Sequence, residues 1–265
     1  MSSDNIKKAI QAGWDEMSDS YQAESRISLD DVHYAPIAPG ERELRLLGDV
    51  RGKRVLELAC GAAQNSIALA KWGAHVTAMD FSSRQLQKAK LLVSSEKVDV
   101  NLIRGDMERL GMFRDAEFDI VLSSFGWEFV PDLGACFDEC SRVLADDGLL
   151  IVCTVHPLTA FEWDEDEKAL LVNDYFNPPV EVWGGSSQAG KDKAVTIFRT
   201  VQEMFDLLTS SGFHIERIVE PYPYPVQSMS EAEKRAMPYS GPFWENQQER
   251  LSRVPFSIVY KARKN

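Results

Sequence analysis

The chain has 265 residues and a formal net charge of −12, which results from 41 acidic and 29 basic residues. This length is compatible with one α/β domain that carries insertions and buries a large core. Because proteins hold phosphate backbones with lysines and arginines, we expect no nucleic-acid partner. The sequence has neither the long apolar run of a membrane span nor the pattern of a signal peptide, so we expect a cytoplasmic protein without a membrane partner.

The cysteines fall in segments with the pattern of strands or core-facing helices. No histidines accompany them at the spacing of zinc ligands, so we expect no metal site and interpret them as buried, reduced thiols. They are Cys60, Cys136, Cys140 and Cys153.

A helix is predicted over residues 6–21, where Ile10, Trp14, Met17 and Tyr21 share roughly one face. We expect this helix to pack across a ligand crevice. The alternative is a helix held in place only by its apolar stripe. A loop then leads into a second predicted helix at Glu41–Leu47.

A buried strand, a turn of small residues and a helix are predicted over residues 55–65. Glu57 lies near the end of the strand, Gly61 lies in the turn, and the helix begins near Gln64. Open α/β sheets bind ligands at this place, the carboxyl end of a parallel strand, and the first N–H groups of the helix suit a carboxylate. A dinucleotide fingerprint needs three glycines, and this turn has one, which argues against a nicotinamide cofactor.

The next two strands also end in acidic residues. The strand at residues 73–80 ends in Asp80, which can accept hydrogen bonds from both hydroxyls of a ribose or cap the helix after Ser82. The strand at residues 98–103 leads to Asp106 and Met107. An acid there can bind an exocyclic amine, and the methionine offers a soft face to an adenine ring.

These motifs resemble those of class I S-adenosylmethionine-dependent methyltransferases, specifically the small-molecule enzymes of methyltransferase types 11 and 25. The resemblance covers roughly residues 53–155. It is strongest at residues 55–61, 76–81, 105–107 and 118–124, and in the helix and strand of residues 140–152. The first turn of that family reads acid-x-G-x-G-x-G. Here Gly61 occupies one glycine position, and Ala59 and Ala63 occupy the other two.

The resemblance implies an α/β, Rossmann-like fold. Its sheet has seven mostly parallel strands with the last one antiparallel, helices cover both faces, and an N-terminal helix and aromatic insertions form a substrate cap. S-adenosylmethionine is the implied cofactor, and S-adenosylhomocysteine is the product. The implied cofactor-binding residues are Glu57, Ala59, Cys60, Gly61, Asp80, Phe81, Asp106, Met107, Ser123, Ser124 and Phe125.

We expect a single methyltransferase domain with three parts. Residues 1–48 form a helical cap, residues 49–155 the cofactor-binding core, and residues 156–265 the substrate-side insertions and last strands. His156 follows the fifth strand, and we expect it to contact the substrate or to act as a general base. Trp127, after the fourth strand, is a further candidate substrate contact. The resemblance also implies an N-terminal aromatic side chain over the crevice, and Trp14 or Tyr21 is the candidate for this substrate contact.

Two aromatic, proline-bearing insertions, residues 161–194 and 221–244, are predicted to form either a lid over the substrate or a homodimer contact. The favoured function is methyl transfer to an O, N, S or C nucleophile of a small metabolite. A methyltransferase acting on protein or RNA and an inactive module that only binds the cofactor are the alternatives.

Overall fold

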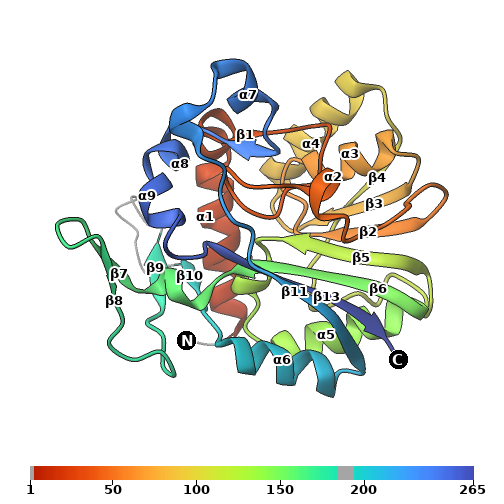
Figure 1. The fold of residues 1–265 in the computed structure, drawn as a ribbon. Coiled ribbons are helices and arrows are strands. Elements are labelled where there is room, and N and C mark those ends of the chain that lie inside the picture. Colours follow the sequence, from red (N-terminus) through yellow and green to blue (C-terminus); the bar gives the residue numbers. More distant parts are fainter. Residues whose placement is uncertain (1–2, 184–193) are drawn as a thin grey trace.

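A seven-stranded sheet runs through the centre of the protein (Figure 1). The computed structural model describes residues 3–183 and 194–265, and residues 184–193 of the first aromatic insertion lie outside the described residues. In space the strands follow the order β11-β13-β6-β5-β2-β3-β4. Their bounds are β2 (Arg54–Leu58), β3 (His75–Asp80), β4 (Val100–Arg104), β5 (Phe118–Ser124), β6 (Leu144–Val155), β11 (Phe213–Val219) and β13 (Ser257–Lys264).

Strand β13 is the one strand of this sheet that runs against the others. It lies between β6 and β11 and pairs antiparallel with both, whereas all pairs among β2, β3, β4, β5 and β6 are parallel. The predicted mostly parallel sheet with an antiparallel last strand is therefore confirmed. The carboxyl ends of β2 to β6 meet at one edge, where ligands bind in open α/β sheets.

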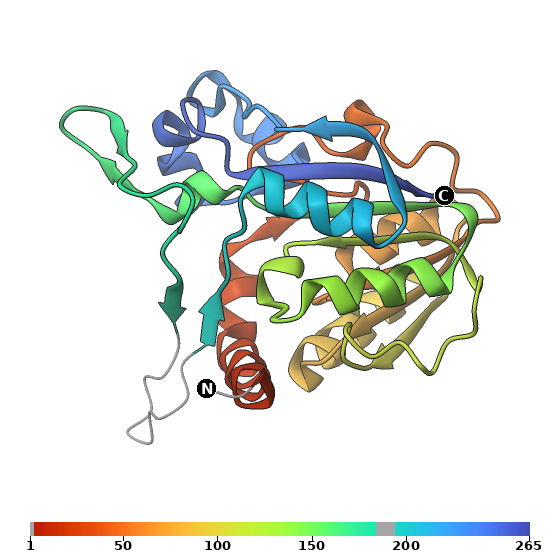
Figure 2. The ribbon, with the colours of Figure 1, turned by 90° about the horizontal axis from the view of Figure 1, so that it is seen from below.

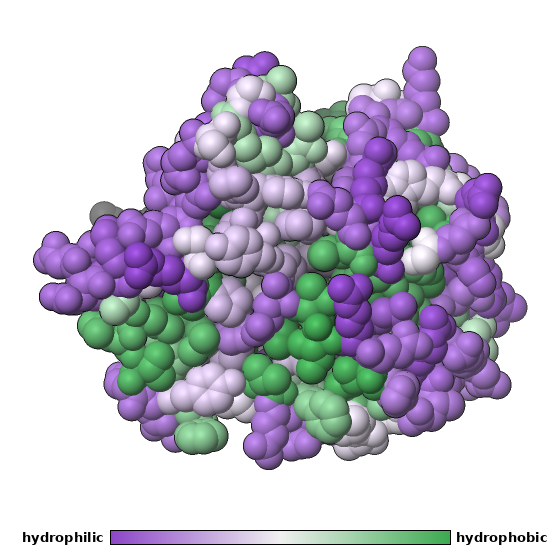
Figure 3. All heavy atoms as spheres, in the orientation of Figure 1, coloured by the Kyte–Doolittle hydropathy of each residue, from purple (hydrophilic) through white to green (hydrophobic). Residues whose placement is uncertain are grey.

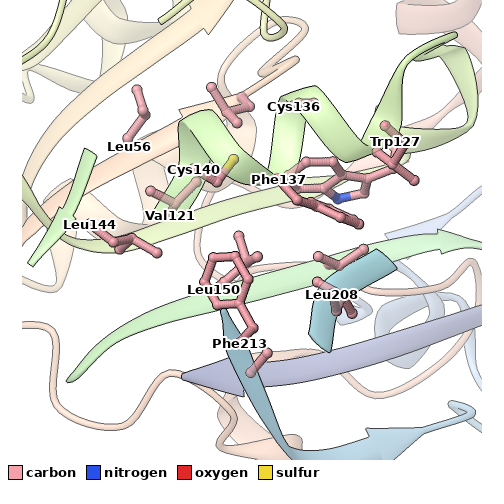
Figure 4. Packing of buried hydrophobic residues seen from close by; sticks show 14 of the residues in the cluster. Leu56, Val121, Trp127, Cys136, Phe137, Cys140, Leu144, Leu150, Leu208 and Phe213 are labelled. Atoms are coloured by element: carbon pink, nitrogen blue, oxygen red, sulfur yellow. The ribbon is translucent and has the colours of Figure 1, made fainter. Parts of the chain in front are cut away.

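Alternate residues of the central strands enter two different cores, as the period of a β-strand requires. On β6, Leu150 and Val152 join the cluster of Phe137 and Leu208, while Ile151 and Cys153 join a second cluster on the opposite face. Figure 4 shows the first cluster, in which side chains from β2, β5 and β6 meet those of two helices. Burial on both faces explains why these strands read as nearly continuous apolar runs.

Helices cover both faces of the sheet. Helices α3 (Gln64–Lys71) and α4 (Ser83–Glu96) lie on one face, and α5 (Leu133–Val143) and α6 (Val201–Ser210) lie on the other (Figures 1 and 2). The predicted helix start at Ser82 is confirmed, because the Ser82 hydroxyl caps α4 by accepting from the Gln85 N–H at 3.1 Å.

Helix α1 (Ser3–Glu24) stands across the carboxyl edge of the sheet (Figure 1). Helix α2 spans Glu41–Leu44 and is shorter than the predicted Glu41–Leu47. It ends because Arg45 adopts a left-handed φ of 51°, after which the N–H groups of Leu46 and Leu47 donate to the Glu41 carboxylate. A buried carboxylate thus replaces the next helical turn.

Smaller elements complete the chain. In and next to the first insertion β7 pairs with β8 and β9 with β10. In the second insertion β12 pairs with β1, which directly follows α1. A hydrophobic patch lies below the β7–β8 hairpin in the view of Figure 3. Phe176 and Val180, which follow β8 in the sequence, are exposed. No described helix is both long and apolar enough to span a bilayer. The bounds are β1 (Arg26–Ile27), β7 (Glu162–Asp164), β8 (Ala169–Leu171), β9 (Glu181–Trp183), β10 (Ala194–Thr196), α7 (Glu231–Ala236), β12 (Tyr239–Ser240), α8 (Pro242–Asn246) and α9 (Gln248–Leu251).

Candidate active site

The turn between β2 and α3 adopts a left-handed backbone at all three positions where a glycine is expected. The φ angles are 50° at Ala59, 55° at Gly61 and 63° at Ala63. An L-residue pays roughly 1–2 kcal/mol for this conformation, and glycine does not. The two alanines therefore keep the geometry of a glycine-rich turn at an energetic cost.

Asp80, at the end of β3, is tied directly to this turn. Its Oδ2 accepts the Gly61 N–H at 2.8 Å, and its Oδ1 accepts the Ser82 N–H at 2.8 Å. The side chain is buried, and this burial raises its pKa to about 6 against the opposing backbone hydrogen bonds. The carboxylate is thus held at the mouth of the turn.

Glu57 lies deeper, below the turn. The hydroxyl of Ser66 on α3 donates to Glu57 Oε2, which fixes the carboxyl group against the helix. Burial raises the pKa of Glu57 to about 7. The residue lines the cavity described below, so a cationic ligand group there would stabilise its ionised form.

Asp106 and Met107 follow β4, the outermost strand, and lie at the same carboxyl edge of the sheet as Asp80. Lys7 of α1 donates to Asp106 Oδ2 at 2.8 Å and also pairs with Glu108. Met107 is partly buried against the main core. Helix α1 therefore contacts the segment in which the sequence predicts adenine binding.

The tip of β5 closes the floor of the site. Phe125 has a positive φ of 63°, and its N–H donates to the Cys153 carbonyl at 2.9 Å. Gly126 lies so close to the turn between β2 and α3 that a β-carbon on Gly126 would lie 2.5 Å from the Ala59 Cβ. Only glycine fits at this approach without displacing its neighbours.

Helix α1 provides the roof through Trp14 and Tyr21. The two rings meet edge to face with centroids 5.4 Å apart, and Trp14 meets Phe129 in the same way at 5.6 Å. Gln22, next along the helix, accepts from the Gln64 side chain at 2.6 Å. The roof is thereby joined to the first turn of α3.

These elements enclose a cavity of about 990 Å³, counting its open mouth. Most residues predicted to bind the cofactor or substrate line it. These are Glu57, Ala59, Cys60, Gly61, Asp80, Phe81, Asp106, Met107, Ser124, Phe125, Trp14 and Tyr21.

His156 does not line this cavity, contrary to the expectation from sequence. Its Nδ1 accepts the Leu158 N–H at 3.1 Å, and its Nε2 lies 3.0 Å from Glu220 Oε1. Both ring nitrogens are therefore engaged outside the cavity, because the chain turns away from the edge after β6. A role for His156 as a general base or substrate contact does not fit this placement.

Trp127 and Ser123 also lie outside the cavity lining. Trp127 is fully buried beside Phe137 in the main core (Figure 4), and its indole N–H donates to the Ser123 carbonyl at 3.1 Å. Successive side chains of a strand point to opposite faces of the sheet, so Ser123 on β5 points away from the face to which Ser124 points, and Ser124 lines the cavity. Trp127 therefore packs in the core and does not make the predicted substrate contact.

The described parts of the two aromatic insertions do not form the expected cap. None of their described residues lines the cavity, and they reach its surroundings through Tyr239, which contacts His33 and Tyr21. The covering elements are instead α1 and the loop before α2.

Several lining residues were not singled out from sequence. His33 carries the strongest sequence signal, because it stands in the otherwise apolar segment Val32–Ala38, which favours burial. The remainder come from helices, strands and turns, and a sequence does not reveal which way their side chains point. They are Lys7, Gln22, Ile27, Gln64, Asn65, Met79, Gln85, Gly105, Glu108, Gly126, Phe129 and Val130.

The four cysteines are buried and form no disulfides. Within residues 3–183 and 194–265, no group of three or more His, Cys, Asp or Glu side chains has the arrangement of a metal site.

Comparison with known proteins agrees with this geometry. A family model described as a methyltransferase domain matches residues 56–152. The fold and site define a class I S-adenosylmethionine-dependent methyltransferase, and the chain belongs to that family. S-adenosylmethionine is accordingly the cofactor, and the turn, Asp80 and the enclosed cavity provide a place of suitable shape and polarity for it.

A demethylmenaquinone methyltransferase from Clavibacter sepedonicus is 30% identical over 191 residues, which are 66% of this chain and 76% of that protein. The uncharacterized methyltransferase YbaJ of Bacillus subtilis is 30% identical over 123 residues, so the match spans about half of each chain, 46% and 48%. Among solved structures, an S-adenosylmethionine-dependent methyltransferase from Mesorhizobium loti is similar in fold. Its TM-score is 0.65 at 23% identity, with 83% of this chain and 95% of that one covered.

Proposed function

We propose that this protein transfers a methyl group from S-adenosylmethionine to an O, N, S or C nucleophile of a small molecule. The observation that carries the proposal is this cavity. Its described lining combines the turn and carboxylates of the predicted cofactor site with aromatic side chains. When bound, S-adenosylmethionine supplies a methyl carbon attached to a positively charged sulfur, which an acceptor attacks directly.

Within this proposal, the chain's own residues hold the cofactor along the edge of the sheet. Glu57 and the turn of Ala59–Gly61 contact the methionine part, and Asp80 accepts from the ribose hydroxyls. Phe81, Asp106 and Met107 surround the adenine, while Ser124 and Phe125 lie toward the sulfur. Holding the nucleophile and the methyl carbon in line is then the main contribution of the protein to the rate.

The roof over the cavity favours a small acceptor. Besides the Lys7 pairs, α1 is joined to α4 by Asp15, which accepts from the Ser82 hydroxyl at 2.5 Å, and by the Asp19–Lys88 ion pair at 2.6 Å. A fixed helix over the opening restricts access by a folded macromolecule. The net charge of −12 further disfavours RNA.

Calorimetric titration with S-adenosylmethionine, S-adenosylhomocysteine and NAD tests the cofactor assignment. We expect micromolar binding of the two sulfur compounds and none of NAD. Transfer of labelled methyl from S-adenosylmethionine in a cell extract, followed by separation at low molecular mass, tests the acceptor. Label in the small-molecule fraction supports the proposal. Label in protein or RNA contradicts it, and binding without any transfer favours an inactive module.

A further inference from the structure

His33 is a buried histidine that faces the cavity and that the cofactor site does not use. The residue is 7% exposed and lines the cavity, and its Nδ1 has no hydrogen-bond partner among the described residues, although the Asn65 side chain lies beside the ring and favours its protonated form. A buried polar atom without a partner is uncommon in folded proteins, because it forfeits the hydrogen bonds that water provides. This arrangement points to a partner supplied by a ligand.

The backbone of His33 is held on both sides. Its N–H donates to Asn65 Oδ1 at 3.1 Å, and its carbonyl accepts from the Ser124 hydroxyl at 2.9 Å. Asn65 belongs to the first turn of α3, and Ser124 ends β5. The loop is therefore fixed to the two elements that also form the cofactor site, and a change of the imidazole leaves these backbone contacts in place.

Aromatic rings enclose the imidazole. The Phe125 ring stacks on it with centroids 6.1 Å apart and planes at 22°, and Tyr239 meets it edge to face at 5.2 Å. The Tyr239 hydroxyl lies 3.4 Å from that of Tyr21, which continues the enclosure to the roof and Trp14. Such walls favour a flat ligand that stacks on or between rings.

Charge narrows the class of ligand further. Of the described residues that line the cavity, Lys7 is the one lysine or arginine, and it is paired with Asp106 and Glu108. An anionic acceptor therefore has no cation available to bind it. Glu57 and Asp80 already accept hydrogen bonds from the protein. The other described carboxylates of the lining are paired with Lys7, so none is left unpaired for an ammonium group.

We propose that the space between His33, Tyr21 and Phe125 is the acceptor subsite, and that it takes a flat, uncharged aromatic hydroxyl compound whose O–H donates to the His33 imidazole. This inference rests on the proposed methyltransferase function and adds to it the class of acceptor and the residue that receives the acceptor's proton.

The proton balance of the step is simple. As the acceptor oxygen bonds to the methyl carbon, the carbon–sulfur bond breaks and its electron pair stays on sulfur. The hydroxyl proton passes to the imidazole and then to water. Burial lowers the pKa of His33 to about 4, so the ring is neutral at neutral pH and free to accept. A weak base is sufficient, because the hydroxyl becomes strongly acidic as the new bond forms.

The binding test uses the full chain loaded with S-adenosylhomocysteine. Catechol and 2-naphthol serve as flat hydroxyl probes, and benzoate and aniline serve as the charged and amine counterparts. We expect calorimetry to show that the hydroxyl probes bind at least about tenfold more tightly than the other two. This difference in affinity corresponds to one hydrogen bond. The proposal is overturned if neither hydroxyl probe binds, or if benzoate or aniline binds as well.

Matched variants separate the imidazole from the fold. His33→Phe keeps a ring for stacking but removes both nitrogens, and His33→Asn keeps polarity but removes the ring. The control is His75→Phe, at an exposed histidine at the opposite end of β3. His33→Phe is expected to weaken the binding of the hydroxyl probes about tenfold. Its affinity for S-adenosylhomocysteine should stay within about twofold of that of the parent protein. Unchanged probe affinity in this variant contradicts the role of His33.

A second readout follows labelled methyl transfer to the same probes. Loss of kcat in His33→Phe with an unchanged KM for S-adenosylmethionine supports proton acceptance by His33, and a loss confined to His156→Asn contradicts it. If the parent protein binds neither S-adenosylmethionine nor S-adenosylhomocysteine, the proposed function fails. If it binds them but does not discriminate among the probes, only the present inference fails.

Discussion

The Cβ of Ala59 occupies the space in which a side chain on Gly126 would stand. A β-carbon built on Gly126 would lie 2.5 Å from the Ala59 Cβ and 2.7 Å from the Ser123 Oγ. The two residues belong to different strand tips, β2 and β5, and their approach sets the width of the cavity floor. A larger side chain on one strand tip therefore requires glycine on the other.

This contact predicts that Gly126→Ala destabilises the protein. Overpacking of this kind costs typically about 1–3 kcal/mol of unfolding free energy, and we also expect weaker binding of S-adenosylhomocysteine. Urea unfolding measures the first effect and calorimetry the second. Adding Ala59→Gly should recover part of the loss, since it removes one of the two clashing atoms. A double-mutant cycle with no coupling energy contradicts the explanation. Gly111→Ala is the control, because a β-carbon at Gly111 meets no atom within 4 Å.

The left-handed conformation of Ala63 leads to a second prediction. Ala63 and Ala68 are both fully buried in the same cluster, but only Ala63 has a positive φ. Ala68→Gly should lower the unfolding free energy by about 1–2 kcal/mol through lost burial and added chain entropy. Ala63→Gly should be about 1–2 kcal/mol less destabilising, because glycine relieves the left-handed strain. If urea unfolding shows the same loss of unfolding free energy in Ala63→Gly and Ala68→Gly, the strain at Ala63 is refuted.

A third prediction concerns Asp80 and the cofactor. Asp80→Asn should weaken S-adenosylhomocysteine binding roughly ten- to hundredfold, the range for hydrogen bonds to a charged group. The ionised carboxylate of Asp80 accepts hydrogen bonds better than the protonated acid does. The affinity should therefore also fall as the pH drops below the pKa of Asp80, which is about 6. Calorimetry between pH 5 and pH 8 measures both effects. The exposed Asp99, just before β4 at the opposite edge, supplies the control Asp99→Asn. Normal affinity in Asp80→Asn removes Asp80 from the cofactor site.

A fourth prediction concerns pH and stability at Glu128. This side chain is 2% exposed and accepts from the Thr154 hydroxyl at 3.1 Å, and burial raises its pKa from 4.5 to about 7. Between these values the folded state binds more protons than the unfolded state, so the unfolding free energy falls as the pH rises. The shift corresponds to at most about 3 kcal/mol.

Glu128→Gln removes this titration. Its unfolding free energy in urea should fall less between pH 4.5 and pH 7.5 than that of the parent protein. Glu57 and Asp80 have raised pKa values as well and leave a residual slope of the same sign. Glu162→Gln, at an exposed carboxylate on β7, should behave like the parent protein. Parallel pH profiles for Glu128→Gln and the parent protein disprove the raised pKa.

Sequence alone predicted the sheet, its order of strands and helices, and the segments that reach its carboxyl edge. Those features depend on local patterns: runs of apolar residues for buried strands, a serine cap at Ser82, and acids at strand ends such as Asp80. Parallel strands joined by helices necessarily bring those ends to one edge, so most of the predicted cofactor residues line one cavity.

Only the tertiary structure decided which side chains face that cavity and what covers it. Trp127 and His156 stand at strand tips, yet one turns into the core and the other away from the edge. His33, which lies far from every motif, enters the cavity because Asn65 and Ser124 hold its loop. The physical reason is that a side chain's direction after a strand ends depends on one or two backbone angles, and long-range hydrogen bonds and packing determine those angles.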